Sequence, residues 1–287
     1  FSALFGCASA TCAAVPEVLD PAVEQVRVLL RDRQIDAAVE RGEAATIAQP
    51  GNGKAWLWLG NAYGQKALAA GLLSKASWAG KCRDAYVRAV ELAPGDPDAR
   101  FSLLQYYLQA PGFMGGGSDK AQTQVDSLEA IGPAWGHMGK AAVLIADDKP
   151  DEAVAEYQSA VAAAPENARA LLGLISIHVG RKNFGAARAA ADAALARNPG
   201  DPVALYMLGR IAVDDGQRID DGIRGLETFI GLASRPDQLP LAAAWWRKAL
   251  LLEKLGQQQA AIDALSRAVQ LDANLEGARK DLARLRP

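Results

Sequence analysis

The side chains best suited to catalysis are two histidines and a cysteine. His137, His178 and Cys82 could serve as a general base, a metal ligand or a nucleophile, but they lie far apart in the sequence. The chain contains no Cys-x-x-Cys motif and no pair of histidines at metal-ligand spacing. We therefore predict no catalytic residue, no metal site and no cofactor. Cys82 is expected in the core, His178 between packed helices, and His137 near an exposed helix start.

A glycine-rich stretch offers the next candidate chemistry. Gly115, Gly116, Gly117 and Ser118 precede a predicted helix, whose N-cap is expected at Ser118 or Asp119. Free backbone N–H groups there could hold an anion. The alternative is an interhelical loop, which we retain as a secondary contact site because it is richer in glycine than a turn requires.

Three adjacent pairs of carboxylates could bind a cation. They are Asp147-Asp148, Asp214-Asp215 and Asp220-Asp221, each at a predicted helix end or loop. Calcium needs a denser set of oxygen ligands than any of these pairs provides. Solvated turns are the favoured interpretation.

Composition limits the classes of partner. The chain of 287 residues carries 31 basic and 33 acidic side chains, so it has no positive field that would gather nucleic acid. Its alanine-rich apolar half favours helix over sheet. Beyond residue 14, no apolar run approaches the roughly 18 residues of a membrane helix.

The first 14 residues differ from the rest of the chain. They are apolar, rich in small residues and uncharged, as in the end of a secretory signal peptide. Small-x-small cleavage options include Ala8-Ser-Ala10. A lipid anchor at Cys7 and an unprocessed cytoplasmic arm are the alternatives. A cleaved segment predicts a periplasmic or secreted protein.

The prolines reveal an internal repeat. Pro165 and Pro199 lie 34 residues apart, and each follows an alanine-rich amphipathic run. Proline cannot continue a helix, so it marks the end of each run. A period of this length is typical of stacked helical hairpins.

Residues around these prolines match a known pattern. The clearest repeat shows Trp56, Leu59, Gly60 and Tyr63 on its first helix, and Tyr86, Ala89 and Pro94 on its second. With these residues the chain resembles the tetratricopeptide repeat family over most of its length. The pattern has a packing reason, because small residues such as Ala153, Ala187 and Ala261 let paired helices approach closely.

The resemblance implies an all-α solenoid of about seven helical hairpins in a right-handed superhelix. The expected repeats span residues 19–51, 53–96, 97–135, 136–167, 168–201, 202–236 and 242–275, with a polar capping helix over 275–286 and a solenoid domain of 19–286. Two insertions are expected, one lengthening the hairpin around residues 66–78 and one at residues 110–118.

In this family, the first helix of each repeat lines a concave groove. Transferred onto this sequence, the groove positions are Leu57, Asn61, Phe101, Gln105, Met138, Leu172, Tyr206, Arg210, Trp246 and Leu250. Trp245 matches a core position, which leaves its neighbour Trp246 for the groove. Leu57 and Phe101 stand where the carboxylate clamp of chaperone-binding members has basic residues, a departure that argues against recognition of an acidic C-terminal tail.

These observations predict a non-enzymatic scaffold or adaptor that binds a protein or peptide in its groove, with a location in the bacterial cell envelope. Self-association through the inserted hairpin of residues 66–78 is an alternative. Another is an enzyme or regulatory subunit that uses the loop from Gly115 to Ser118. The oligomeric state and the partner's identity do not follow from the sequence.

Overall fold

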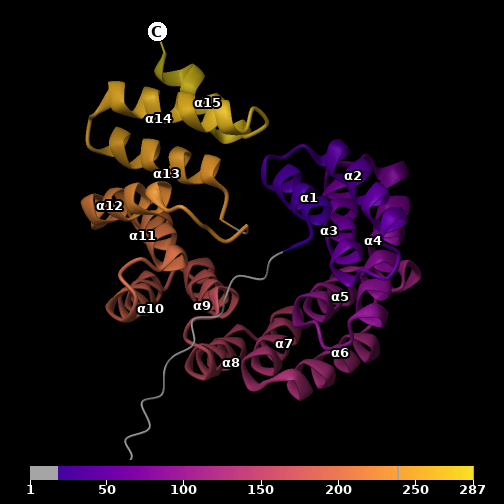
Figure 1. Ribbon diagram of the computed structural model, residues 1–287. Coiled ribbons are helices and arrows are strands. Elements are labelled where there is room, and N and C mark those ends of the chain that lie inside the picture. Colours follow the sequence, from indigo (N-terminus) through magenta and orange to yellow (C-terminus); the bar gives the residue numbers. More distant parts are fainter. Residues whose placement is uncertain (1–18, 238, 287) are drawn as a thin grey trace, which may run out of the picture.

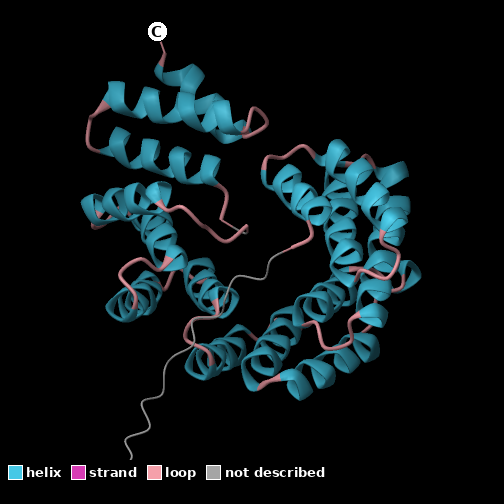
Figure 2. Cartoon of the chain, viewed as in Figure 1, coloured by secondary structure: helices cyan, strands magenta, loops and turns pink. Residues whose placement is uncertain are grey.

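The computed structural model describes residues 19–237 and 239–286, which form an all-helical solenoid (Figure 2). The first helices of the seven hairpins are α1 (Pro21–Arg31), α3 (Gly53–Ala69), α5 (Pro97–Gln109), α7 (Pro133–Ala146), α9 (Ala168–Gly180), α11 (Pro202–Asp215) and α13 (Leu241–Lys254). Their partners are α2 (Ile35–Ala48), α4 (Leu72–Leu92), α6 (Ser118–Ile131), α8 (Pro150–Ala163), α10 (Phe184–Arg197), α12 (Ile219–Gly231) and α14 (Gln258–Leu271). A short 3-10 turn, η1 (Gly112–Met114), follows α5, and α15 (Glu276–Leu285) closes the described chain. The predicted all-α solenoid is confirmed, whereas the proposed signal segment and Cys7 lie outside the described residues.

Four of the first helices begin at the same local signal. Asn52, Asp96, Asn167 and Asp201 are the N-caps of α3, α5, α9 and α11, and each side chain accepts hydrogen bonds from backbone amides of the first turn. Each cap stands two residues after a proline. Such a cap contributes about 1 kcal/mol, so the recurring Pro-x-Asx triplet fixes where these helices begin.

Small residues bring neighbouring helices together, both between hairpins and within one. A Cβ at Gly173 on α9 would lie 2.2 Å from a ring carbon of Tyr157 on α8, and one at Gly60 on α3 would lie 2.5 Å from the Tyr86 ring on α4. Ala153 and Ala187 are fully buried at the matching positions of second helices. The spacing therefore reflects close packing, as the sequence predicted.

The first insertion lengthens one hairpin. Helices α3 and α4 contain 17 and 21 residues, so their shared end projects beyond the neighbouring repeats. The Trp78 ring packs on Tyr63, with 5.7 Å between ring centroids. Lys81 Nζ lies 4.7 Å from the centroid of the Trp78 ring. The hairpin end is thus held by aromatic and cation–π contacts.

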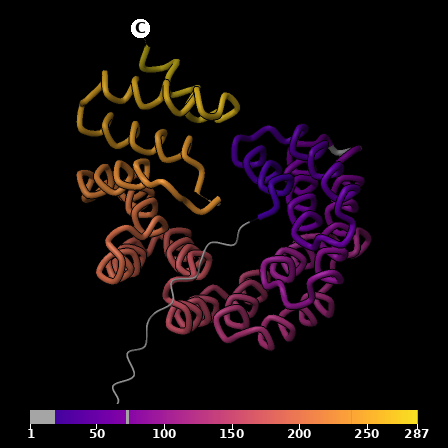
Figure 3. Tube along the Cα trace, in the orientation of Figure 1, coloured from indigo at the N-terminus to yellow at the C-terminus, as the bar shows by residue number. Residues whose placement is uncertain are grey.

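The stack of hairpins curves until its two ends meet. Figure 1 shows α1, α3 and α5 on the inner side of the curve, with α2, α4 and α6 outside them. The Cα trace in Figure 3 shows the loop before α13 reaching inward toward α1. Arg27 of α1 forms an ion pair with Asp237 in this loop at 2.9 Å, and Arg33 lies 3.9 Å from Asp272 in the α14–α15 turn. In the described part of the chain, no helix is both long and apolar enough to cross a membrane.

Candidate functional site

A large groove lies on the inner side of the first three hairpins. Its volume is about 1060 Å³, and α1, α3, α4 and α5 supply most of its walls. Its lining residues are Arg27, Leu30, Arg31, Arg33, Trp58, Asn61, Gly64, Gln65, Ala67, Leu68, Lys75, Ala76, Ala79, Cys82, Tyr86, Ser102, Gln105, Tyr106, Gln109, Ala110, Pro111, Phe113, Met114, Arg169, Asp237 and Pro240. A groove of this size accommodates a peptide segment or a small molecule.

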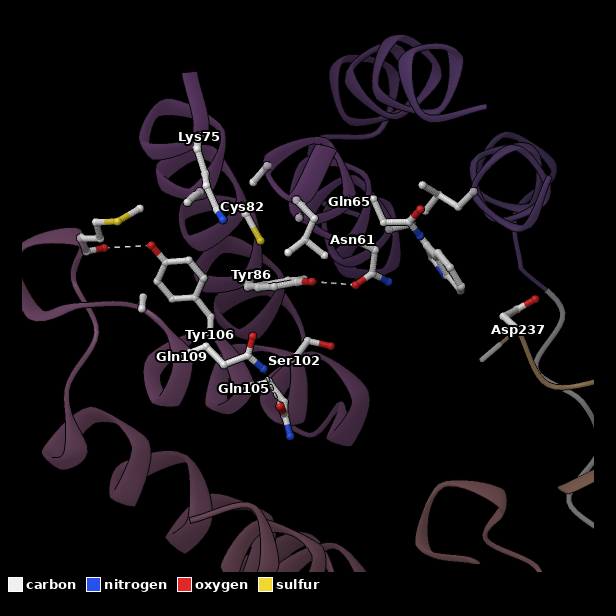
Figure 4. Close-up of a pocket in the computed structure, with 18 of the residues that line it drawn as sticks. Asn61, Gln65, Lys75, Cys82, Tyr86, Ser102, Gln105, Tyr106, Gln109 and Asp237 are labelled. Atoms are coloured by element: carbon white, nitrogen blue, oxygen red, sulfur yellow. Dashed lines mark hydrogen bonds between the residues drawn. The ribbon is translucent and has the colours of Figure 1, made fainter. Parts of the chain in front are cut away.

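Carboxamides form the floor of the groove. Tyr86 Oη donates a hydrogen bond of 2.8 Å to Asn61 Oδ1, and Gln109 Nε2 donates one of 3.0 Å to Gln105 Oε1. Figure 4 shows the Asn61 nitrogen pointing away from Tyr86. Gln65 Oε1 is buried and accepts no hydrogen bond from a described residue. A carboxamide offers both a donor and an acceptor, which are the groups that an extended peptide backbone also presents.

Basic side chains line one side of the groove. Arg27 is paired with Asp237 across the mouth, and Arg31 lies 3.2 Å from Asp32. Arg169, at the start of α9, reaches back to Asp98 on α5 at 2.9 Å. Most of this positive charge is therefore already neutralised by the protein's own carboxylates.

Apolar side chains line the other end, where the two insertions meet. Leu68 is 78% exposed at the end of α3, and Phe113 is 87% exposed in η1. Both line the groove, together with Met114 and with Ala76 and Ala79 of α4. Large apolar side chains left in water beside a groove are typical of binding surfaces.

Burial suppresses the ionisation of the thiol and hydroxyl groups in the groove. Burial raises the pKa of the Cys82 thiol to about 12. Burial likewise raises the pKa values of the Tyr86 and Tyr106 hydroxyls. At neutral pH these groups are protonated and uncharged, so the thiol supplies little thiolate.

The structure brings only two of the ten predicted groove residues into this groove. Asn61 and Gln105 line it. The predicted exposure of four others is wrong, because they lie at 5% exposure or less: Leu57, Phe101, Met138 and Tyr206. The curve of the stack turns these positions toward the next hairpin, so they fill the core between repeats instead of facing the groove.

The remaining four predicted groove residues lie in the C-terminal half. Leu172, Arg210, Trp246 and Leu250 are half-buried and line no part of the groove. Trp246 donates its indole N–H to Asp281 Oδ2 at 2.8 Å, and a Cβ at Gly277 would touch its ring. Its role is to dock α15 on α13, so the expectation that it faces an open groove is wrong.

The three glycine amides of the inserted loop are engaged within the protein. The amides of Gly115, Gly116 and Gly117 donate to the carbonyls of Gly112, Pro111 and Tyr107. These N–H groups are thus unavailable to an anion.

Residue 117 itself marks the start of α6. Gly117 is the N-cap, so the expected cap at Ser118 or Asp119 is one or two residues late. Ser118 is the first residue of the helix, and its side chain does not cap it.

The three catalytic candidates stay apart, on α4, α7 and α9. Cys82 and His178 are buried, as expected. His137 is half-buried and its Nδ1 lies 2.7 Å from Glu156 Oε2. Asp215 departs from the predicted solvated turn, because it is mostly buried and pairs with Arg188 at 2.7 Å.

A sequence signal for part of the groove was available. Gln65 follows Asn61 by four residues and Gln109 follows Gln105 by four, which places each pair on one face of its helix. Asp237 carried no such signal, because it reaches α1 only through the closure of the superhelix.

The fold and the groove define a helical-repeat protein of the general class that serves as a protein–protein interaction scaffold. Sequence models described as tetratricopeptide repeat match residues 144–211 in one case and residues 23–77 and 206–276 in another. The chain belongs to the tetratricopeptide repeat family.

Solved structures support the same fold. Yeast Tom70 is similar at 16% identity with a TM-score of 0.58, over 96% of this chain and 58% of that one. Cut9, from the APC/C hetero-tetramer Cut9–Hcn1, is similar at 17% identity with a TM-score of 0.52, over 92% of this chain and 48% of that one. This chain thus spans about half the length of the structures that it matches. No curated protein sequence matches it significantly.

Proposed function

We propose that this protein is a non-enzymatic scaffold that holds an extended peptide segment of a protein partner in the groove of α1, α3, α4 and α5. The observation that carries the proposal is the row of carboxamides along the floor. Asn61, Gln65, Gln105 and Gln109 line one groove from two adjacent first helices. Their donors and acceptors match a peptide backbone irrespective of its side chains.

The electrostatics of the groove support binding over chemistry. The groove contains no described histidine, and its buried Cys82 and Tyr86 have raised pKa values. Selectivity for a particular partner would come from the side chains around the floor, which are basic on one side of the groove and apolar at its other end.

A photo-crosslinking experiment tests the proposal. A photoreactive benzoyl-phenylalanine replaces Gln105 in the groove, and in a second protein it replaces Gln122, which is exposed on the outer helix α6. Irradiation in the native host should join the Gln105 derivative to a discrete protein, whereas the Gln122 derivative should give no such product. Equal crosslinking at both positions would contradict the proposal that the partner binds in the groove.

We also propose that the protein acts in the bacterial cell envelope. The composition of residues 1–14 supports this location. Fractionation of the natural full-length protein tests it, with protease protection in intact cells and in spheroplasts. Release with the periplasmic fraction is the expected outcome, and recovery with the cytoplasm would contradict it.

A further inference from the structure

The end of the groove formed by the two insertions has a composition of its own. We define the insertion face by its lining residues Leu68, Lys75, Ala76 and Ala79 of the lengthened hairpin and Phe113 and Met114 of the inserted loop. We propose that this face is a binding subsite for an acidic amphipathic peptide segment, in which large apolar side chains alternate with carboxylates. The inference rests on the proposed function and names the class of partner.

The loop that carries Phe113 is held in place by hydrogen bonds. Tyr106 Oη donates a hydrogen bond of 2.8 Å to the Met114 carbonyl, and Lys120 Nζ donates one of 3.0 Å to the Gly115 carbonyl. Arg83 Nη1 also reaches the Met114 carbonyl at 3.3 Å. The loop is therefore held in one shape while its largest apolar side chain stays in solvent.

Glycine is required for this shape. A Cβ at Gly116 would lie 1.8 Å from the carbonyl oxygen of Ala110, and Gly115 has a φ of 90°. Leu68 presents a second exposed apolar side chain from α3. The fixed backbone that carries these two apolar anchors limits the conformational entropy lost when a partner binds.

Both insertions lack carboxylates. Residues 44–83 contain five basic side chains and no Asp or Glu, and residues 99–118 contain no Asp or Glu. Lys75 is exposed and forms no ion pair with any described residue. Lys66, Lys81 and Arg83 are paired with Asp36, Glu43 and Asp84, so Lys75 is the basic side chain of the insertion face that is left to a partner. Charge complementarity thus favours an anionic partner.

The form of the surface favours a peptide over a lipid bilayer. The insertion face belongs to a groove, and its apolar side chains continue into the carboxamide floor formed by Gln105 and Gln109. A flat membrane could touch only the rim, whereas a peptide can fill the groove and bond to the floor. Lys75 does not occupy a position of the family's carboxylate clamp. The residues at the clamp positions, Leu57 and Phe101, are buried.

A peptide selection tests the inference. Phage-displayed random peptides of 12 residues are selected on the full chain, and the binders are sequenced and synthesised with a fluorescent label. We expect enriched sequences that combine Phe, Leu or Trp with Asp or Glu. Affinity should fall at least about tenfold in the double variant Leu68→Ser with Phe113→Ser. It should fall up to about fivefold in Lys75→Glu and recover when one Glu of the peptide becomes Lys.

Ile47→Ser is the matched control, because Ile47 is 81% exposed on α2 and does not line the groove. Circular dichroism verifies that each variant is folded. Binders that lose affinity in Asn61→Ala but not in the Leu68 and Phe113 double variant would overturn the inference and leave the proposed function standing. Failure to select any binder would overturn both.

Two further measurements test whether a membrane or a second copy of the chain binds the insertion face instead. Sedimentation with vesicles of phosphatidylcholine and phosphatidylserine, mixed 7:3, should leave the protein in the supernatant; pelleting that Phe113→Ser abolishes would overturn the inference in favour of a membrane. Sedimentation velocity should give the same species for wild type and Phe113→Ser. Dissociation of a dimer by that substitution would instead assign the face to a second copy of the chain.

Discussion

The guanidinium of Arg27 on α1 and the carboxylate of Asp237 in the α12–α13 loop meet 210 residues apart in the sequence. Arg27 Nη1 donates hydrogen bonds of 2.9 and 3.2 Å to the two carboxylate oxygens. The same guanidinium is also paired with Glu24. Because both Arg27 and Asp237 line the groove, this contact closes the superhelix at the mouth of the candidate site.

Reversing one charge of this pair should open the superhelix. Either Arg27→Glu or Asp237→Arg replaces attraction by repulsion, whereas the double exchange restores an ion pair. Pairs of this kind contribute up to about 1 kcal/mol, so losing the attraction should lower the ratio of closed to open molecules by up to about fivefold. Small-angle X-ray scattering would report a larger radius of gyration for each single variant and the wild-type value for the double variant.

Arg31→Glu is the control for the closure, because Arg31 lines the same groove but pairs with Asp32. It should leave the radius of gyration unchanged. Raising the salt concentration to about 0.5 M should mimic the single variants, since it screens exposed pairs. An unchanged scattering profile in all of these conditions would show that the ends stay together without the Arg27–Asp237 contact.

Gly173→Ala should destabilise the repeat that contains α9. The new methyl group would overlap the Tyr157 ring, so we expect a loss of about 1 to 3 kcal/mol. Gly180→Ala is a matched control on the same helix, because nothing lies within 4 Å of a Cβ there. Urea unfolding followed by circular dichroism measures both. Equal midpoints for the two variants would contradict the packing argument.

Trp246→Ala should weaken the C-terminal cap. The substitution removes the packing of the indole on Gly277 and its hydrogen bond to Asp281, at a cost of roughly 2 to 3 kcal/mol for a side chain that is only partly buried. Trp246→Phe keeps most of the ring and should cost about 1 kcal/mol. Thermal unfolding and hydrogen exchange of α15 would measure both. If the amides of α15 exchanged as slowly in Trp246→Ala as in the wild type, Trp246 would not hold the cap in place.

Stability should fall as the pH drops from about 7 to 5, in part because of His178. Burial lowers the pKa of this imidazole, and the charge of Arg181 lowers it further. The unfolded chain, with a histidine pKa of about 6.5, therefore binds the proton more tightly than the folded chain, so acid favours unfolding. His178→Gln should flatten this part of the profile of unfolding free energy against pH. His137→Gln, which removes the other histidine, should leave the His178 contribution in place.

The sequence allowed the repeat and its packing rules to be predicted, but only part of the site. Pro165 and Pro199 gave the period, and small residues such as Ala153 marked the packed positions. Asn61 and Gln105 were found because the groove positions of the family were transferred onto this sequence. Phe101 was misplaced because exposure at a given repeat position depends on how sharply the stack curves.

What the sequence determined by itself is local. Hydrophobic periodicity, proline stops and Asx caps act over a few residues, so they specify helices, hairpins and their order. What only the tertiary structure decided is which faces remain in water. The curvature of the stack accumulates over every hairpin, so it sets the Arg27–Asp237 contact and the docking of Trp246 against α15. The same accumulated geometry brings Leu68 and Phe113 from separate insertions to one groove.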